Sequence, residues 1–371
     1  MNLGFALFNY FPYGGLERDM LTFARVCQGR GHDITIYTGE WQGDKPEDIR
    51  LIQFELHAYS NHARANEFAV RLQQARDPKH HAMVGFNKMP GLDVYYAADV
   101  CYAEKAFEER NIFYRMTPRC RTYLALEKSV FGCDSKTEIM MISKAQIDVY
   151  RRYYQTPHER LHLLPPGINR ERIMPSNYDE MRPKLRAHYG LKDTDYLMIC
   201  VGSDFQRKGV DRALRGMAAL REPLRDHVKL WVAGRDNDKP FRALARKLGI
   251  ETQVSFLGAR DDVAQLLWSA DAFLHLAYSE NTGTVLLEGM VAGLPVIATD
   301  VCGYAHYIVD NEMGCVLGGA VTPNQVAEAM THVLKEKRSV WHERSRLFSD
   351  KADIFSMPQH AADLIEQVAS H

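Results

Sequence analysis

The chain has 371 residues, of which 46% are hydrophobic and 25% are charged, and its formal net charge is −1. This length suggests two domains of an ordinary globular protein. The near-neutral charge excludes bulk attraction to nucleic acid, so any attraction to a charged surface has to come from a local patch. The seven cysteines include no Cys-x-x-Cys pair, which favours a reduced, cytoplasmic compartment and argues against structural zinc.

Short apolar runs alternate with amphipathic stretches along the whole chain, which is typical of an α/β protein with parallel sheets. The N-terminal run lacks the basic flank of a signal peptide, and no apolar stretch is long enough to span a bilayer. Strands are predicted at residues 3–8, 33–37, 82–86, 94–97, 138–142, 196–201, 229–233, 254–257, 272–276 and 295–299. Helical periods lie between most of them, for example at residues 15–28, 212–220, 241–248 and 263–269.

The pattern is interrupted at Pro165-Pro166-Gly167, which can continue neither a helix nor a central strand. It restarts at Tyr196 with a strand, a glycine and a helix. We therefore expect two doubly wound domains, residues 1–164 and 168–354. The last helix, residues 355–371, is expected to pack back on the first domain.

A glycine pair, Gly14-Gly15, follows the first strand and opens a helix. Such a turn lets a ligand approach the backbone, and the start of a helix favours an anion. The alternative is a plain tight turn, with Glu17 and Asp19 as ordinary acids of the first helical turn.

Residues 85–102 of the first domain contain two predicted strand ends with Asn87, Lys88 and Asp99. A carboxylate at the end of a strand is a candidate for acid–base or electrostatic work, and the alternative for Asp99 is a structural cap.

Residues 102–131 interleave basic and aromatic side chains, including Arg115, Arg119 and Arg121. This composition is typical of helices that lie on anionic lipid, although four glutamates dilute the charge. The alternative is an amphipathic surface helix with its aromatic face in the core.

In the second domain, Arg207 and Lys208 follow the strand at 196–201, in a position where doubly wound domains bind ligands. Adjacent arginine and lysine match a diphosphate, whereas a solvated basic loop is the alternative. Arg260 follows the strand at 254–257 and could contact a nucleobase.

The segment from Ser279 to Glu288 contains the most specific pattern of the chain, Glu280-Asn281-Thr282-Gly283-Thr284-Val285 followed by an apolar run to Glu288. We expect a strand before Glu280 and a helix through to residue 292, with Glu288 a little over two turns into that helix. Backbone N–H groups at a helix start bind an anion, and the flanking carboxylates bind hydroxyls, which together describe a nucleotide-sugar site.

Considered together, these motifs resemble the retaining nucleotide-sugar glycosyltransferases of family 4. The resemblance rests on Glu280…Glu288, Gly14-Gly15, Arg207-Lys208-Gly209 and Pro165-Pro166-Gly167. It implies the GT-B fold, in which two Rossmann-like domains face each other across a cleft. Segments 10–16, 87–95, 97–105 and 302–308 are similar to one subfamily, the lipopolysaccharide core glucosyltransferases I of the WaaG type, which add glucose to an inner-core heptose.

The resemblance implies a role for each matching position on the donor side. Glu288 binds the ribose hydroxyls, and Glu280 binds the donor sugar beside the reacting carbon. Arg207 and Lys208 neutralise the diphosphate, together with backbone N–H groups of the first glycine turn and the start of the later helix. The remaining donor-contacting positions are Gly14, Gly15, Arg172, Arg260, Gly283, Thr284 and Val285. Asn281 and Thr282 stand where enterobacterial members have Ala-Ala, so they could tune the choice of hexose.

Asp19 and Asp99 match acids on the acceptor side, where they would be catalytic together with Glu280. The resemblance also implies a UDP-sugar donor, a heptose-containing lipopolysaccharide acceptor, no metal cofactor, and peripheral attachment to the cytoplasmic face of the inner membrane through Arg115, Arg119 and Arg121. Other readings stay open: another UDP-hexose or N-acetylhexosamine donor, a nucleotide-sugar epimerase, a glycoside hydrolase with two carboxylates, or a membrane-surface binding protein without catalysis.

Overall fold

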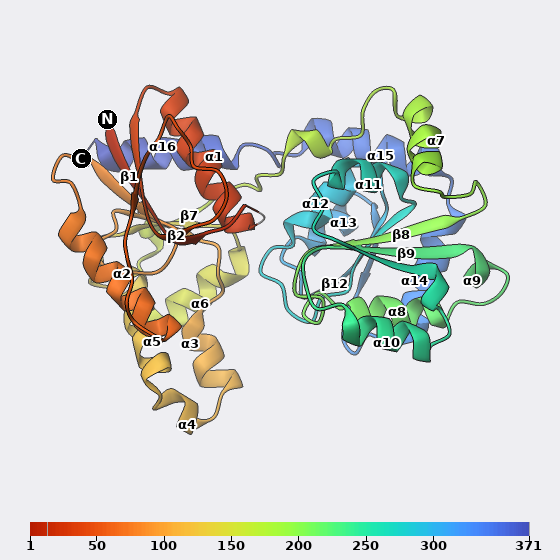
Figure 1. Ribbon diagram of the computed structural model, residues 1–371, viewed down its shortest axis with the longest axis horizontal. Helices are drawn as coiled ribbons and strands as arrows, with labels where there is room; N and C mark the ends of the chain where they lie inside the picture. The colour runs from red at the N-terminus through yellow and green to blue at the C-terminus, as the bar shows by residue number, and fades with distance from the viewer. Residues whose placement is uncertain (13, 371) are drawn as a thin grey trace. The chain divides into compact units, whose positions relative to one another are not determined.

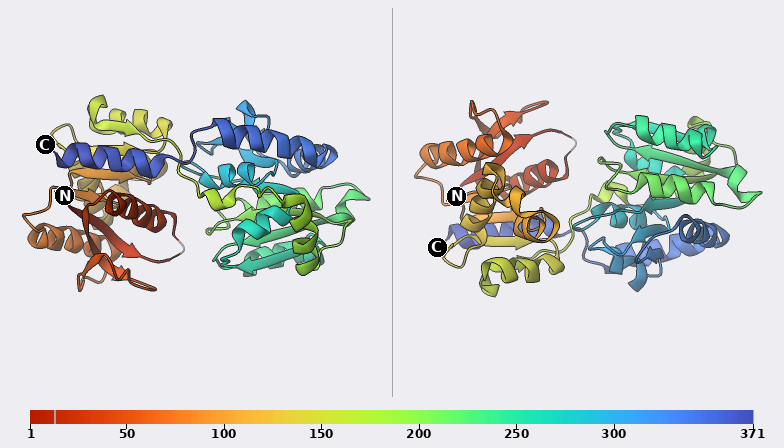
Figure 2. Two further views of the ribbon diagram at one scale, coloured as in Figure 1. Left: turned by 90° about the horizontal axis from the view of Figure 1, so that it is seen from above. Right: turned by 90° about the horizontal axis from the view of Figure 1, so that it is seen from below.

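The computed structural model describes residues 1–12 and 14–370, so Tyr13 of the glycine turn lies outside the described part. The chain forms two compact units: Met1–Pro166 together with Ser356–His371, and Gly167–Phe355. Each unit is an α/β domain built on one parallel sheet, with helices on both faces (Figures 1 and 2). The prediction of a parallel α/β fold is confirmed.

The sheet of the first unit has seven strands in the order β3-β2-β1-β4-β5-β6-β7. The strands are β1 (Asn2–Tyr10), β2 (Asp33–Trp41), β3 (Arg50–Gln53), β4 (Ala82–Gly85), β5 (Val94–Ala97), β6 (Glu138–Met141) and β7 (Leu161–Leu163). The main helices are α1 (Gly15–Gly29), α2 (Asn61–Ala75), α5 (Pro118–Phe131), α6 (Lys144–Tyr154) and α16 (Met357–Ala369). Three short helices precede α5: α3 (Tyr102–Glu104), the π-helix η1 (Lys105–Glu109) and α4 (Ile112–Arg115).

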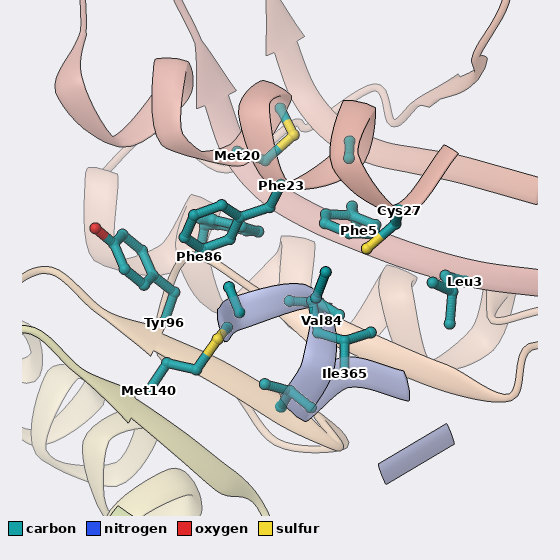
Figure 3. Close-up of a cluster of buried hydrophobic side chains, with 14 of the residues drawn as sticks. Leu3, Phe5, Met20, Phe23, Cys27, Val84, Phe86, Tyr96, Met140 and Ile365 are labelled. Atoms are coloured by element: carbon teal, nitrogen blue, oxygen red, sulfur yellow. The ribbon is translucent and has the colours of Figure 1, made fainter. Parts of the chain in front are cut away.

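Alternation along the strands divides the apolar side chains of this unit between two cores. In β1, Leu3 and Phe5 point to the face covered by α1 and α16, whereas Ala6 points to the face covered by α2 and α5. Figure 3 shows Ile365 of α16 lying against Val84 of β4 within the first of these cores. The last helix of the chain therefore completes the core of the first unit.

The sheet of the second unit has six strands in the order β10-β9-β8-β11-β12-β13. The strands are β8 (Tyr196–Val201), β9 (Val228–Ala233), β10 (Val254–Gly258), β11 (Ala272–His275), β12 (Val296–Thr299) and β13 (Gly314–Leu317). The helices are α7 (Tyr178–His188), α8 (Val210–Ala218), α9 (Leu224–His227), α10 (Lys239–Lys247), α11 (Val263–Ser269), α12 (Thr284–Val291), α13 (Ala305–Asp310), α14 (Pro323–Lys335) and α15 (Arg338–Lys351).

The helix that contains Glu288 differs from the one expected. Its N-cap, Gly283, has a φ of 79°, a left-handed conformation that ends the helix on its N-terminal side. Because α12 begins at Thr284, Glu288 lies about one turn into the helix and not two. The segment from 102 to 131 also differs, because it forms four consecutive helices and not one amphipathic helix.

Candidate active site

The loop after β8 places Arg207 and Lys208 at the carboxyl end of the second sheet. Gly209 has a φ of 71°, and a Cβ added there would lie 1.9 Å from the carbonyl oxygen of Leu276. The amide of Tyr278 donates to the carbonyl of Arg207 at 2.8 Å, which joins the loop to the segment after β11. Only glycine permits this close approach, so the sequence Arg-Lys-Gly fixes both cations beside the β11 loop.

Glu280 follows β11 and receives those cations. Lys208 Nζ forms a short ion pair with Glu280 Oε2, and Arg207 Nη1 lies 3.4 Å from the same oxygen. His275, the last residue of β11, places its Nε2 3.1 Å from that oxygen. Burial alone raises the pKa of Glu280, but the hydrogen bond from His275 and the charge of Lys208 outweigh burial and hold that pKa well below its usual value.

Glu288 is buried in α12 and pairs with Arg172, whose Nε lies 3.5 Å from Glu288 Oε2. Arg172 belongs to a short 3₁₀ helix (Arg170–Arg172), and Trp268 Nε1 donates to its carbonyl at 3.4 Å. The structure thus brings together two of the predicted donor contacts that are far apart in the sequence.

Arg260 has a different partner from the groups described above. Its guanidinium donates to Asp262 at 2.8 and 2.5 Å, and Asp262 also accepts from the hydroxyl of Tyr189 at 2.7 Å. The guanidinium is therefore already paired, and a ligand at Arg260 would compete with Asp262.

The residues between the two glutamates pack against the loop after β12. The amide of Tyr304 donates to the carbonyl of Thr282 at 2.8 Å. A Cβ added at Gly303 would lie 2.3 Å from the carbonyl oxygen of Asn281. Thr282 is buried, and its hydroxyl lies 3.4 Å from that of Thr284, the first residue of α12. Asn281 and Thr282 therefore sit on a closely packed loop that leads directly into Gly283, Thr284 and Val285.

In the first unit, the glycine turn has an unexpected neighbour. A Cβ added at Gly14 would lie 1.7 Å from Glu17 Oε2, so the Glu17 carboxyl folds back over the start of α1. Next to it, a Cβ added at Gly15 would meet open space. Burial raises the pKa of Glu17, and the charges of Asp19 and Asp99 raise it further, against a backbone hydrogen bond that lowers it. Glu17 is thus a buried acid and not the ordinary first-turn residue of our alternative reading.

Asp19 and Asp99 lie near the end of β5. The hydroxyl of Tyr96, on β5, donates to Asp19 Oδ2 at 2.9 Å. Asp99 is exposed in the following loop, and the hydroxyl of Tyr150 donates to its backbone carbonyl at 3.1 Å. Glu17 interacts electrostatically with both aspartates, so the three acids form one negatively charged region of the first unit.

Lys88, singled out in the sequence as a strand-end cation, is buried and neutralised inside this unit. Its Nζ lies 2.5 Å from the fully buried Glu127 of α5 and 3.2 Å from the carbonyl of Val100. Glu127 also accepts the amides of Tyr102 and Ala103 at 2.8 and 2.9 Å, at the start of α3. The pair holds the Asp99 loop to α5, which is a structural role.

The helices η1 and α4 form an exposed apolar and basic tip, which we call the α4 tip and which consists of Phe107, Ile112, Phe113, Met116, Arg119 and Arg121. Arg115 differs from the other two predicted arginines: its guanidinium donates to the carbonyls of Ala106 and Phe107 at 3.1 and 2.5 Å. Arg115 therefore holds the tip together, whereas Arg119 and Arg121 are exposed on α5.

Within residues 1–12 and 14–370, no helix combines the length and apolarity needed to cross a bilayer. The same residues contain no group of three or more His, Cys, Asp or Glu side chains arranged to hold a metal ion.

With this geometry established, comparison with known proteins identifies the family. Residues 181–352 match the family described as glycosyl transferases group 1. Over 368 residues the chain is 43% identical to the lipopolysaccharide glucosyltransferase WaaG of Escherichia coli (strain K12), and the match covers 98% of each chain. The chain belongs to the WaaG family of glycosyltransferases.

Solved structures agree with membership of the WaaG family. A crystal structure of WaaG, a glycosyltransferase involved in lipopolysaccharide biosynthesis, matches at a TM-score of 0.91 with 42% identity, covering 98% of this chain and 99% of that one. A structure of Anabaena HepE in complex with UDP and glucose matches at a TM-score of 0.76 with 16% identity, covering 99% and 100%. The second match shows the shared GT-B fold.

Sequence reasoning missed one residue in each unit that contacts a predicted site residue. His275 contacts Glu280, but it is the last residue of an apolar strand, where a histidine is expected to be an ordinary core residue. Glu17 covers Gly14, although its position in the first helical turn is common for any glutamate. The glycine three residues before Glu17 is a signal in the sequence that could have identified Glu17. A glycine at that position leaves room for the Glu17 side chain to fold back over the start of the helix.

Proposed function

We propose that the protein transfers glucose from UDP-glucose to an inner-core heptose of lipopolysaccharide, with retention of anomeric configuration. The observation that carries the proposal is the convergence of Lys208 and Arg207 on the partly buried Glu280, shortly before α12, in a chain related to WaaG over 98% of its length. Two adjacent cations match a diphosphate, and a buried carboxylate matches sugar hydroxyls.

The proposed reaction needs no divalent metal, because Arg207, Lys208 and the N–H groups at the start of α12 provide positive charge for the departing diphosphate. The acceptor hydroxyl attacks the anomeric carbon from the face on which the diphosphate leaves. The bond from that carbon to the phosphate oxygen breaks, a diphosphate oxygen takes the hydroxyl proton, and UDP departs. Configuration is retained without a protein nucleophile.

Other residues receive roles that follow from their chemistry. Glu288 is assigned to the ribose hydroxyls, supported by its burial and its partner Arg172. Arg260 is assigned to the donor nucleotide, and the open space at Gly15 to close approach of the diphosphate. Asp19 and Asp99 are assigned to the acceptor, which they orient as hydrogen-bond acceptors.

The test is to incubate the protein with a panel of UDP-hexoses and lipopolysaccharide truncated at the inner-core heptose, without added metal and with chelator. We expect a mass increase of one hexose from UDP-glucose and an α-linked product by NMR. Conversion of the UDP-sugar without acceptor would indicate an epimerase, and release of free hexose from a glycoside a hydrolase. Transfer from another UDP-hexose only would overturn the glucose assignment and leave Asn281 and Thr282 as the residues to exchange.

We also propose that the enzyme attaches peripherally to the cytoplasmic face of an anionic membrane through the α4 tip. Four apolar residues there are exposed by 43% to 77%, and Arg119 and Arg121 are exposed in the first turn of α5, which follows in the sequence. Each basic residue at an anionic surface contributes about 1 kcal/mol. Charge reversal of Arg119 and Arg121 should release the protein from vesicles containing phosphatidylglycerol, whereas the exposed Arg346 of α15, reversed as a control, should not. Arg115 is unsuitable for this test because its loss would disrupt the tip itself.

A further inference from the structure

Three donors converge on one oxygen of Glu280. Lys208 Nζ, His275 Nε2 and Arg207 Nη1 all contact Oε2, whereas Oε1 lies 3.2 Å from the amide of Asn281. The Glu280 side chain is only 11% exposed. The same cations that are assigned to the donor's diphosphate are thus paired with the protein's own carboxylate.

The three donors differ in how firmly they are held. His275 is 1% exposed and ends β11, so its ring is fixed by the sheet. Lys208 reaches Glu280 through a flexible stem that passes over Gly202, and the Arg207 side chain is 40% exposed. The two cations can therefore move to a neighbouring anion, whereas the imidazole cannot follow them.

The imidazole is a donor in this contact. Burial lowers the pKa of His275, so the ring is neutral near pH 7. Glu280, whose pKa is held low, is ionised and can only accept hydrogen bonds, so the proton of the ring lies on Nε2. The contact therefore persists whether or not Lys208 remains in place.

We propose that Glu280 is a stand-in counter-ion for the donor's diphosphate, and that His275 is the positioning residue that holds its carboxylate in place when Lys208 and Arg207 transfer to the phosphates. This inference rests on the proposed function of the site. UDP alone takes the cations and gives Glu280 nothing in return, because it lacks the hexose. An intact UDP-hexose supplies hydroxyl donors to the same carboxylate, which replace the lost ion pairs. The transfer of the two cations from Glu280 to the phosphates therefore favours binding of the UDP-hexose over binding of UDP, and it helps the release of UDP after the reaction.

The test compares the affinities for UDP and for UDP-glucose by calorimetry, without acceptor, in the wild type and in three variants. Glu280→Gln removes the Glu280 charge from both cations, while Arg207 keeps its ion pair with Asp204, and should bind UDP about fivefold more tightly than the wild type. His275→Leu should keep UDP affinity and lose the preference for UDP-glucose over UDP by a similar factor. His275→Gln, whose amide nitrogen can reach the Nε2 position, should restore that preference.

The outcomes separate this inference from the proposed function. A wild type that binds neither nucleotide contradicts the proposed function itself. Wild-type binding together with Glu280→Gln that binds UDP equally or more weakly overturns the counter-ion role. His275→Leu with an unchanged ratio of the two affinities overturns the positioning role, because a merely structural histidine would weaken both ligands alike. If His275→Leu does not fold, the Glu280→Gln comparison still decides the exchange.

Discussion

Two glutamates, one in each unit, stand next to groups assigned to an anionic ligand, yet their surroundings are opposite. Glu17 folds over the glycine turn at the start of α1 and has Asp19 and Asp99 nearby, so its pKa is raised. Glu280 lies directly before α12 among Lys208, Arg207 and His275, so its pKa is lowered. The same residue type thus marks an acidic region in one unit and a cationic region in the other. The cationic region of the second unit matches the chemistry of a phosphate, whereas the acidic region of the first unit matches that of hydroxyl groups.

The largest expected effect tests the cationic region around Glu280. Lys208→Met should weaken UDP binding by about two orders of magnitude, since a hydrogen bond to a charged group contributes about 1.5–3 kcal/mol. Calorimetry at two salt concentrations measures the loss and its ionic component. The exposed Lys247 of α10, changed to Met, is the matched control and should bind UDP as the wild type does. Equal affinity in both variants would contradict the assignment of Lys208.

A smaller effect is expected on the acidic side. Asp99→Ala should reduce the rate of transfer at saturating donor by about tenfold, less than the roughly 10²–10⁴-fold typical of a group that transfers a proton, because Asp99 is assigned to orienting the hydroxyl. Its affinity for UDP should stay unchanged, because Asp99 is assigned to the acceptor. Steady-state kinetics with Asp134→Ala as an exposed control in the same unit measures the effect. A near wild-type rate would remove Asp99 from the site.

The smallest effect concerns stability, and it has opposite signs in the two units. A raised folded-state pKa means that Glu17 favours folding below its unfolded pKa and that this contribution is lost as the pH rises. Glu17→Gln should therefore stabilise its unit increasingly from pH 4 to pH 8. A lowered pKa means that Glu280 favours folding above about pH 4.5, and that this contribution is lost as the pH falls.

Glu280→Gln should accordingly destabilise its unit at pH 6 and do so less at pH 4. For both variants the quantity to measure is the sign of the change in unfolding free energy with pH. Hydrogen exchange read from peptides of each unit separates the two contributions. If the effects of the two substitutions on unfolding free energy changed with pH in the same direction, the opposite surroundings of Glu17 and Glu280 would be contradicted.

The strands that the sequence predicts best are the buried central ones. The bounds of β5 and β8 agree with the predicted ranges, because continuous apolar runs mark strands that are covered on both faces. The strands that were missed are β3, β7 and β13, which lie at sheet edges. They are short and half-exposed, so their side chains form no distinct apolar pattern.

For the candidate site, the motifs and the chemistry of the side chains identified individual residues, but they did not predict which residues contact each other. Glu280, Lys208 and Arg207 could be listed from the sequence, whereas their mutual contact depends on Gly209 and Leu276 meeting in space. Lys88 was singled out at a predicted strand end and Arg115 as a lipid-facing cation, but Lys88 pairs with Glu127 inside the first unit and Arg115 donates to backbone carbonyls of η1. Such long-range pairings leave no local trace, because the partner of a charge is decided by the fold and not by its neighbours in sequence.

The position of α16 has a consequence for how the protein is made. Ala361, Ala362 and Ile365 are fully buried in the core of the first unit, although they follow the whole second unit in the sequence. Domains generally fold as the ribosome releases them, from the N-terminus onward. In this chain all residues of the second unit are synthesised before α16. Until α16 is synthesised, the first unit has an uncovered apolar face beside α1. The core of the first unit is therefore completed only after the second unit has been synthesised, and a nascent chain stopped before residue 356 would present that face to chaperones.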